Sequence, residues 1–454
     1  MSTTSSSLEN PIEWEPQPEA ANIVNAIVKQ YLIDFEGADN FASRLLNETG
    51  TRFLDWIDHL VLPSKPEMAE QLEKVGFSLT QGEGYQIAQH HQGMFPAILL
   101  KENTKTECHL KVDSVADFLF THKLDGSTKI TGPAGSQLRM ALFCQNETHQ
   151  LSVIERHGWN QFSMPQNNTS QIAKALHHFD LFRRRERDLE SNESGFNLAK
   201  SLIQEAIDDL GTDWTCDLFF EAERQFWQSR NHAARIQKSR QDALGMGWSN
   251  HDHHTYRSSR EAYQSLIATL EILGFNCRER FYAGAEAGWG AQVLEHPVCG
   301  ILIFADVDLL AEEVTGDFSH DGLPPLGTTG TIGTWCRLHG EAFLQAGMHH
   351  LESLFDCQAA KSQLAKVGVE TMAPFTEFSY LWQAFTVGEK WQVSEKRIQA
   401  ALAEGIIDQK QAEKCRNEGG IGSHLEILER NDGYKGFNQT GINDIILRTD
   451  PRRH

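Results

Sequence analysis

The sequence predicts an α+β fold of four βαβββ units in two pairs, with a helical lead-in and a central helical layer. Three observations predict it. A pattern of one strand, one helix and about three more strands begins four times along the 454 residues. A long segment with apolar positions at helical spacing separates the second unit from the third. The hydrophobic content of 40% is ample for buried cores.

The first pair of units is expected over residues 19–165, after a disordered tail over residues 1–18. Apolar residues at helical spacing within 19–50 predict the helical lead-in. The first unit then opens with a strand over 53–63. The second unit opens with a strand over 107–112 and repeats the same order of elements.

The helical layer is expected over residues 166–248, between the two pairs. Its apolar spacing predicts three helices, over 171–190, 197–210 and 217–242. The Arg, Gln and Glu residues of this layer are typical of a solvated surface. The layer is therefore predicted to connect and cover the sheets.

The second pair is expected over residues 249–454. Its first unit opens with a strand over 253–256, and its last strand covers 423–430. Two features interrupt this pair: a Gly/Thr/Pro-rich loop over 316–333 and a helical insertion over 394–415. We interpret the loop as a cover over a site.

Composition excludes several classes of function. A formal net charge of −21 argues against binding to a nucleic-acid backbone or an anionic membrane surface. The eight cysteines form no C-x-x-C pair, which is typical of a reduced, cytoplasmic protein. The first residues lack the pattern of a signal peptide, and no apolar run reaches the roughly 18 residues of a membrane helix. We expect a cytoplasmic protein with a small-molecule partner, and the sequence leaves its oligomeric state open.

Histidines and glutamates in the second pair point to a metal site. The first strand of each unit there carries a histidine doublet, 253–254 and 349–350, and the last strand carries Glu426 and Glu429. Adjacent residues of a strand point to opposite faces, so only one of each pair can reach a shared ion. Two histidines and one carboxylate with open positions are the ligand set of non-haem Fe(II) oxygenases.

Three segments carry a resemblance to a known family. They are Asp252–Arg257, Met348–Leu351, and Leu425–Arg430 followed by Gly433 and the Gly436-Phe437-Asn438 turn. They resemble the two histidine strands and the glutamate strand of the vicinal oxygen chelate superfamily. The second half, from residue 249 to about 450, resembles 4-hydroxyphenylpyruvate dioxygenase and, more closely, the 2-oxoadipate dioxygenase/decarboxylase family.

This resemblance implies a particular ligand set. By position in the family pattern, His253, His350 and Glu426 would hold Fe(II), while His254 and His349 would support these ligands or pack around them. In this interpretation His251 and Asp252 lie at the entrance of the site. Related members use Mn, Zn, Ni or Co, so these metals stay open. The expected reaction is an oxidative decarboxylation and hydroxylation of a 2-oxo acid by dioxygen.

Arg257 narrows the expected substrate. It follows His253 by four residues and so shares its face, about 13 Å along the strand at roughly 3.3 Å per residue. An arginine at this spacing in the 2-oxoadipate enzymes is expected to hold the distal carboxylate, which a planar guanidinium suits. We therefore expect Arg257 to bind a short 2-oxo dicarboxylate.

The first half is expected to be a metal-free scaffold. His59 and His109 lie on the two corresponding strands, but Ser152 aligns with Glu426, and a hydroxyl replaces an anionic ligand poorly. Pro63 stands where the second half has Arg257. Glu155 aligns with Glu429, and a second metal site that uses Glu155 stays open.

Two other functions also stay open. Related chelate-fold proteins use a metal for isomerisation, epimerisation or ring cleavage without a 2-oxo acid. Other members of the superfamily bind or sequester a ligand without turnover. Oxygen dependence and metal content would separate these alternatives from a dioxygenase.

Overall fold

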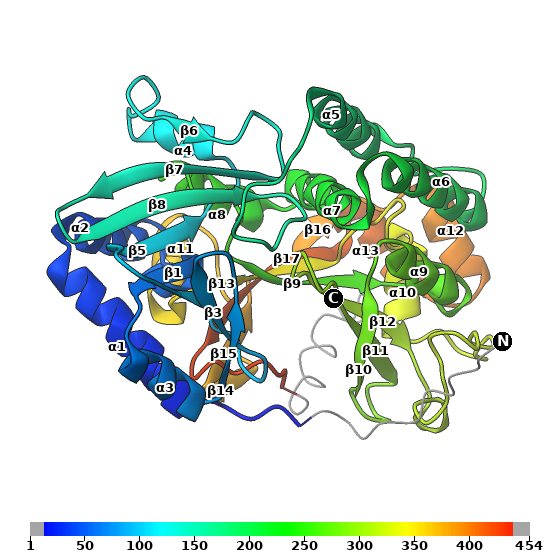
Figure 1. Ribbon diagram of the computed structural model, residues 1–454. Coiled ribbons are helices and arrows are strands. Elements are labelled where there is room, and N and C mark those ends of the chain that lie inside the picture. Colours follow the sequence, from blue (N-terminus) through cyan, green and yellow to red (C-terminus); the bar gives the residue numbers. More distant parts are fainter. Residues whose placement is uncertain (1–12, 439–454) are drawn as a thin grey trace.

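The structure is a computed structural model and describes residues 13–438. Figure 1 shows the first half, in blue and cyan, beside the second half, in green to red. Each half contains one mixed sheet, of eight strands in the first half and nine in the second. The predicted α+β class is confirmed.

The first half begins with two helices and a π-helical turn, α1 (Pro18–Asp34), α2 (Glu36–Arg44) and Leu45–Thr49. The first unit comprises β1 (Ile57–Pro63), α3 (Pro66–Lys74), β2 (Phe77–Gln81), β3 (Tyr85–His90) and β4 (Ala97–Lys101). The second comprises β5 (Thr106–Lys111), α4 (Val115–Thr121), β6 (Ile130–Thr131), β7 (Leu138–Gln145) and β8 (His149–Arg156). The predicted helical lead-in and both units are present.

The central helical layer comprises α5 (Thr169–Arg184), α6 (Asn192–Leu210), α7 (Thr212–Ser229) and α8 (His232–Asp242). We predicted one helix over 217–242, but the structure breaks it before His232. The side chain of Asn231 accepts a hydrogen bond from Ala234 N and so caps a new helix there. Asn231 Nδ2 also donates to Ser423 Oγ at 2.9 Å. A contact distant in sequence therefore fixes the break.

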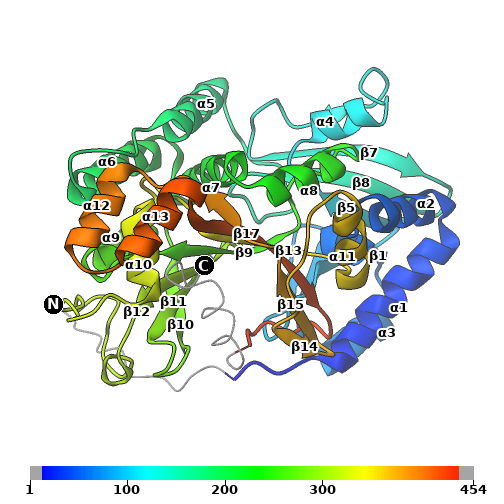
Figure 2. The same cartoon turned by 180° about the vertical axis from the view of Figure 1, so that it is seen from behind.

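The third unit comprises β9 (His251–Arg257), α9 (Arg260–Ile272), β10 (Asn276–Tyr282), β11 (Trp289–Glu295) and β12 (Leu302–Asp308). The fourth comprises β13 (His350–Leu354), α11 (Cys357–Lys366), β14 (Thr376–Phe378), β15 (Leu381–Phe385) and β17 (Gly420–Arg430). Between β15 and β17 lie β16 (Glu389–Trp391), α12 (Glu395–Ala403) and α13 (Gln409–Glu418). Helix α10 (Thr331–His339) connects the two units, and Figure 2 shows it from behind, beside α12 and α13.

Both sheets have the same topology. The strand orders are β2-β3-β4-β1-β5-β8-β7-β6 and β10-β11-β12-β9-β13-β17-β15-β14. In each half the two units join through their first strands, β1 with β5 and β9 with β13, which run antiparallel. Each first strand also runs parallel to the last strand of its own unit. The sheets are therefore duplicates, as the internal repeat predicted.

The helical layer covers one face of the second sheet. An apolar core joins Trp214 and Phe219 of α7 to Tyr256 of β9 and to Leu351 and Leu425 of the neighbouring strands. The residues that alternate with them on these strands face the other side of the sheet. That second face is where the polar residues of the predicted site lie.

The described part of the N-terminal tail packs against the C-terminal turn. Gln17 N donates to Asp432 O at 2.6 Å, and the Lys435 ammonium lies 4.9 Å from the Trp14 ring centroid. Residues 1–12 of the expected tail lie outside the described residues. The stretch from Trp14 onward is thus packed structure, although we expected a tail as far as residue 18.

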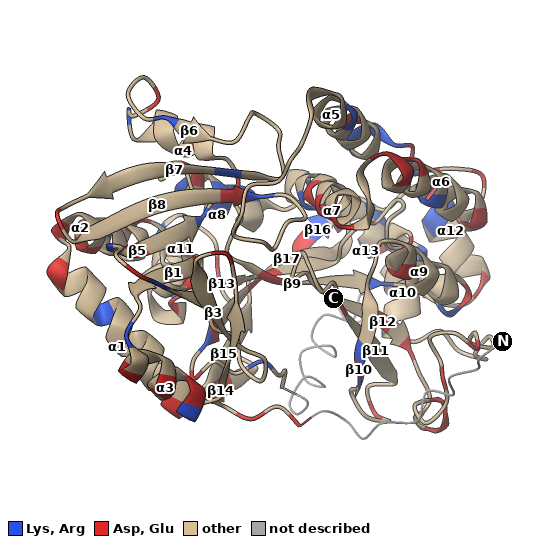
Figure 3. Cartoon of the chain, viewed as in Figure 1, with Lys and Arg blue, Asp and Glu red and all other residues tan. Residues whose placement is uncertain are grey.

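Charged residues are distributed over both halves, with acidic and basic positions interspersed on the helices (Figure 3). Within residues 13–438, no helix combines the length and the apolar character needed to cross a membrane.

Candidate metal centre

Strand β9 separates its side chains between two faces. His253, Thr255 and Arg257 line a cavity. His254 and Tyr256 face the helical layer instead, where His254 Nε2 lies 3.4 Å from an arginine of α7. The strand thus places the predicted ligand and the predicted substrate-binding arginine in one cavity.

The other two predicted ligands reach the same cavity. His350 Nε2 lies 3.7 Å from Glu426 Oε2, and both residues are buried. Glu429, the alternative on the same strand, accepts a hydrogen bond from Cys357 N at 2.9 Å, outside the cavity. His253, His350 and Glu426 therefore line one cavity, with Arg257 in the same wall.

His349 does not follow the expected alternation. It precedes β13, whose strand geometry begins at His350, and it lines the cavity as well. Its Nδ1 pairs with Gly422 O at 3.0 Å, so this ring is held by the backbone of β17. His349 therefore lies in the cavity wall beside His350, because alternation of side chains holds only within the regular strand.

Glu352 is a site residue that we did not predict. Its Oε1 lies 2.5 Å from His350 Nε2 and 3.2 Å from His253 Nε2, between the two histidines. Ligand atoms of His253, Glu352 and Glu426 all lie within 4.8 Å of one another. Strand alternation could have predicted Glu352 as a site residue, because it lies two positions after His350 and so shares its face.

Burial and neighbouring charges shift the pKa values of Glu426, Glu352 and His253. Burial raises the pKa of Glu426, and the adjacent charge of Glu352 raises it further. Burial also opposes ionisation of Glu352, but His253 and His350 lower the pKa of that carboxyl. Although burial disfavours charged His253, Glu352 and Asp252 raise its pKa to about 10. The cluster thus holds two carboxylates with opposite pKa shifts, an arrangement that a divalent cation would neutralise.

A buried ion pair orients His253. Asp252 Oδ2 accepts a hydrogen bond from His253 Nδ1 at 2.8 Å, and Arg430 binds the same carboxylate through Nε at 2.8 Å and Nη2 at 2.9 Å. The proton is thereby held on Nδ1, and Nε2 is directed into the cavity. We expected Asp252 at the entrance, but its side chain is fully buried because it serves this pair.

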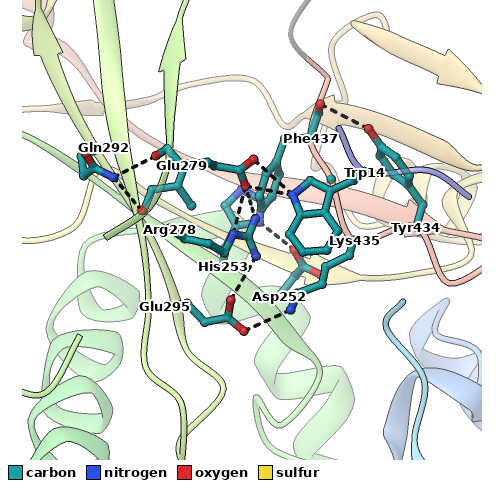
Figure 4. A network of polar contacts seen from close by, with 12 residues as sticks. Trp14, Asp252, His253, Arg278, Glu279, Gln292, Glu295, Tyr434, Lys435 and Phe437 are labelled. Carbon is teal, nitrogen blue, oxygen red and sulfur yellow. Dashed lines mark hydrogen bonds and ion pairs between the residues drawn. The ribbon is translucent and has the colours of Figure 1, made fainter. Parts of the chain in front are cut away.

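The turn after β17 closes over His253. Arg430 Nη1 donates to Tyr434 O and Gly436 O, which shapes the turn, and the Phe437 ring lies 5.0 Å from the His253 ring. Figure 4 shows Phe437 beside His253, with Trp14 and Arg278 next to them. The Gly-Phe turn of the resemblance therefore forms part of the cavity wall.

The first half contains the same orienting group. Asp58 Oδ2 pairs with His59 Nδ1 at 2.6 Å, and Arg156 binds that carboxylate at 2.7 and 2.9 Å. Arg156 also donates to two backbone carbonyls of the following turn, and the Phe162 ring of that turn lies 4.9 Å from His59. The contacts that join Asp252, His253, Arg430 and Phe437 to one another thus have counterparts in the first half.

Glu352 and Glu426 have no acidic counterpart at the register-matched positions, although Glu107 lies 3.2 Å from His109 Nε2. Across the parallel ladders, His109 pairs in register with Ser152, whereas Glu352 pairs with Glu426. By register His109 therefore corresponds to Glu352, and not to His350 as we predicted. The rings of His59 and His109 stack at 4.1 Å.

Glu155 is directed away from these histidines. Its carboxylate accepts a hydrogen bond from Val115 N at 2.8 Å and pairs with Arg139 at 3.0 Å and His157 at 3.1 Å. The second site that used Glu155 is thus not assembled in the structure.

Comparisons with known proteins were made at three levels. No family model and no curated protein matches the chain. Similar solved structures include a triple mutant of 4-hydroxymandelate synthase from Streptomyces coelicolor, with 11% identity and a TM-score of 0.30, over 88% of this chain and 99% of that one. Methylmalonyl-CoA epimerase from Mycobacterium tuberculosis matches 40% of this chain and 88% of its own, with 14% identity and a TM-score of 0.23.

A xylose isomerase-like TIM barrel/4-hydroxyphenylpyruvate dioxygenase fusion protein also matches, with 10% identity and a TM-score of 0.24, over 92% of this chain and 57% of that one. The paired βαβββ units of each sheet have the organisation predicted from the internal repeat.

Aromatic rings line the cavity together with polar side chains. It encloses about 650 Å³, including its opening to solvent. Its aromatic lining consists of Phe281, Trp289, Phe304, Phe375, Phe385 and Phe437. Gln383 Nε2 donates to Glu426 Oε1 at 2.8 Å, which fixes that carboxylate. The polar groups are thus held in place among aromatic rings, as in a small-molecule site.

Asp306 accompanies Arg257 in the cavity. The two side chains approach to 4.0 Å, and both are buried. Burial raises the pKa of Asp306 to about 8 despite the opposing charge of Arg257. Asp306 lies opposite Arg257 in the parallel register of β12 and β9. Sequence alone does not reveal this pairing, because it depends on the sheet order.

Proposed function

We propose that this protein is an Fe(II)-dependent dioxygenase that decarboxylates and hydroxylates a 2-oxo acid. One observation carries the proposal: His253, His350 and Glu426 line one cavity that also contains Arg257. This donor set suits a non-haem Fe(II) centre, although Mn, Zn, Ni and Co accept the same ligands.

The cluster fits a metal ion on its own geometry. Among residues 13–438, Glu352 Oε2 and His350 Nδ1 are buried without a hydrogen-bond partner. Two adjacent buried carboxylates are costly unless a cation or a proton neutralises them. The residues proposed to hold the ion are His253, His350 and Glu426. A bound Fe(II) would supply the redox chemistry that dioxygen requires and a chelating centre for the 2-oxo carboxylate.

The protein groups would perform the remaining tasks. Asp252 keeps the proton of His253 on Nδ1, so that Nε2 stays available as a ligand. Gln383 fixes Glu426, and the aromatic lining excludes water from the reacting atoms. Arg257 would bind the distal carboxylate of the substrate, which favours a 2-oxo dicarboxylate of the 2-oxoadipate kind.

The experiment measures oxygen uptake and carbon dioxide release. Protein purified without oxygen and loaded with Fe(II) is supplied with 2-oxo acids of increasing length, with and without a distal carboxylate. We expect coupled oxygen uptake and carbon dioxide release, fastest with a dicarboxylate, and neither from Glu426→Ala. The control is Glu429→Gln, on the same strand but outside the cavity, which should stay active. Normal turnover by Glu426→Ala would contradict the proposal.

Glu352 favours a second candidate, a metal-dependent isomerase or epimerase. If Glu352 also binds the ion, four protein ligands leave two positions of an octahedron, enough for a chelating substrate alone. A carboxylate beside such a substrate is also placed to take a proton from a carbon next to a carbonyl.

The two candidates predict opposite results for one variant. In an isomerase, Glu352→Gln abolishes the exchange of substrate C–H with solvent deuterium under nitrogen. In a dioxygenase, wild-type protein shows no turnover under nitrogen, and Glu352→Gln keeps oxygen uptake. Deuterium exchange by the Zn or Mn form without oxygen would therefore select the isomerase.

A further inference from the structure

A second group of reactive side chains lies away from the cavity. Cys216 is on α7, while His296 and Cys299 are in the short connection between β11 and β12. One ligand atom of each, the two sulfurs and a ring nitrogen, lie within 4.8 Å of one another. Two thiols from separate parts of the chain therefore face each other, where the helical layer meets the second sheet.

The connection that carries His296 and Cys299 is held in a fixed shape. His296 N donates to Ile301 O at 2.9 Å, and Gly300 N donates to His296 O at 2.9 Å. His296 Nδ1 accepts hydrogen bonds from Val298 N at 3.2 Å and Cys299 N at 3.1 Å. The backbone of this turn thus fixes both the imidazole and Cys299.

The hydrogen bonds of His296 determine its tautomer. Because Nδ1 accepts, the neutral ring carries its proton on Nε2. That atom is buried and has no hydrogen-bond partner among residues 13–438, with Asp213 Oδ1 at 3.7 Å. A nitrogen of this imidazole lies within 4.8 Å of both sulfurs, and a histidine beside a thiol favours its ionised form. The anion that this cluster can form is a thiolate.

The two cysteines differ in access. Cys216 is fully buried, whereas Cys299 is partly exposed. Cys299 Sγ lies 3.3 Å from Asp213 O, and the side chain of Asp213 is 47% exposed. A small oxidant can therefore reach Cys299 first, with Cys216 behind it as the second thiol.

We propose that Cys299 and Cys216 form a peroxide-sensitive pair that closes to a disulfide between α7 and the β11–β12 connection. The Cys299 thiolate attacks hydrogen peroxide: an S–O bond forms, the O–O bond breaks, and the leaving hydroxide takes a proton to give water. The Cys216 sulfur then attacks Cys299 Sγ: the S–S bond forms, the S–O bond breaks, and a second water leaves. Two thiols lose two electrons and two protons, and one peroxide becomes two waters.

The cross-link would act on the cavity through two strands. Strands β11 and β12 carry Trp289, Phe304 and Asp306, which line the cavity. Tying their connection to α7 restricts how these strands move relative to the helical layer. This proposal does not depend on the reaction assigned to the cavity.

The experiment maps disulfides after peroxide treatment of the full-length, fully reduced protein. With stoichiometric hydrogen peroxide, we expect a peptide that links Cys216 to Cys299, the loss of two of the eight alkylatable thiols, and full reversal by dithiothreitol. The oxidised protein should unfold at a higher temperature than the reduced protein. In Cys216→Ser, Cys299 should instead accumulate as sulfenic acid, because the resolving thiol is absent.

Cys144→Ser is the matched control. Cys144 on β7 is also partly exposed, and this variant should form the cross-link at the wild-type rate. His296→Gln should oxidise several-fold more slowly while its circular dichroism stays unchanged. Oxidation of Cys144 and Cys299 at equal rates, without a linked peptide, would overturn the proposal. A bound metal ion that protects both thiols from peroxide would also overturn it, in favour of a metal site.

Discussion

Replacing Arg430 with glutamine removes one partner of the buried ion pair that orients His253. Arg430 and Asp252 are 7% and 4% exposed, and two hydrogen bonds join them. A hydrogen bond to a charged group is worth about 1.5–3 kcal/mol, and breaking a buried pair costs about 3–5 kcal/mol. The free energy of unfolding should therefore fall by roughly 3–5 kcal/mol. Because Asp252, which orients His253, also loses the group that holds it, metal affinity should fall about 10- to 100-fold.

The duplicated fold provides the control. Arg156→Gln removes the same pair from the first half, where Arg156 binds Asp58 at 2.7 and 2.9 Å. Chemical denaturation should show a similar loss of stability in both variants. Isothermal titration with Fe(II) or Mn(II) should show weaker binding in Arg430→Gln alone. Equal loss of metal affinity in the two variants would refute the role of Arg430 in orienting a ligand, and so would unchanged affinity in Arg430→Gln.

Three further predictions test other parts of the chain. Arg257→Met should raise KM for a 2-oxo dicarboxylate roughly 10- to 100-fold, which corresponds to about 1.5–3 kcal/mol. KM for a 2-oxo monocarboxylate should stay unchanged. Equal effects on both substrates would contradict the role of Arg257 in binding the distal carboxylate. Burial opposes protonation of His157, but hydrogen bonds to Asp217 and Glu155 raise its pKa well above the ordinary value. The contribution of charged His157 to the stability of the folded protein is therefore fully present below about pH 6.5. It disappears as the pH rises through the folded-state pKa, so the melting-temperature gap between wild type and His157→Gln should shrink from pH 6 to alkaline pH. Asn231→Ala should cost about 1–2 kcal/mol in chemical denaturation by removing the cap of α8, and a loss below a few tenths would mean that the cap is dispensable.

Much of the site follows from strand periodicity. His253 and Arg257 share a face because they are four residues apart in one strand, and Glu426 and Glu429 differ by an odd step. The structure places His253, Arg257 and Glu426 at one cavity and Glu429 outside it. This reasoning works because β9 and β17 are regular strands around these residues.

The same reasoning misses residues where geometry depends on neighbours. Asp252 points toward Arg430 although it is adjacent to His253, because the ladder between β9 and β13 shifts register next to it. His349 lines the cavity because it precedes β13. Asp306 becomes a site residue only when β12 pairs with β9. None of these contacts is encoded in a local pattern.

Helix α10 shows the same limit in the fold. We predicted a loop as far as residue 333, but α10 begins at Thr331. The carboxylate of Asp308 accepts hydrogen bonds from Ile332 N and Gly333 N, both at 2.9 Å. The cap therefore comes from the end of β12 and not from a residue next to the helix, so a search for a local cap does not find this start.

Comparison of the two halves distinguishes the residues that position a histidine, which both halves share, from the residues that could bind a metal, which differ. Both halves hold a histidine by an Asp–Arg pair and cover it with a phenylalanine, so this group alone does not indicate a metal. The halves differ at register-matched positions: Glu426 and Glu352 in the second half stand where the first has Ser152 and His109. Besides the orienting aspartate, the first half has Glu107 at 3.2 Å from His109 Nε2, whereas the second half gathers two carboxylates, Glu352 and Glu426, around His253. A function that depended on the shared group would be present in both halves, whereas the proposed function requires the acidic residues and so belongs to the second.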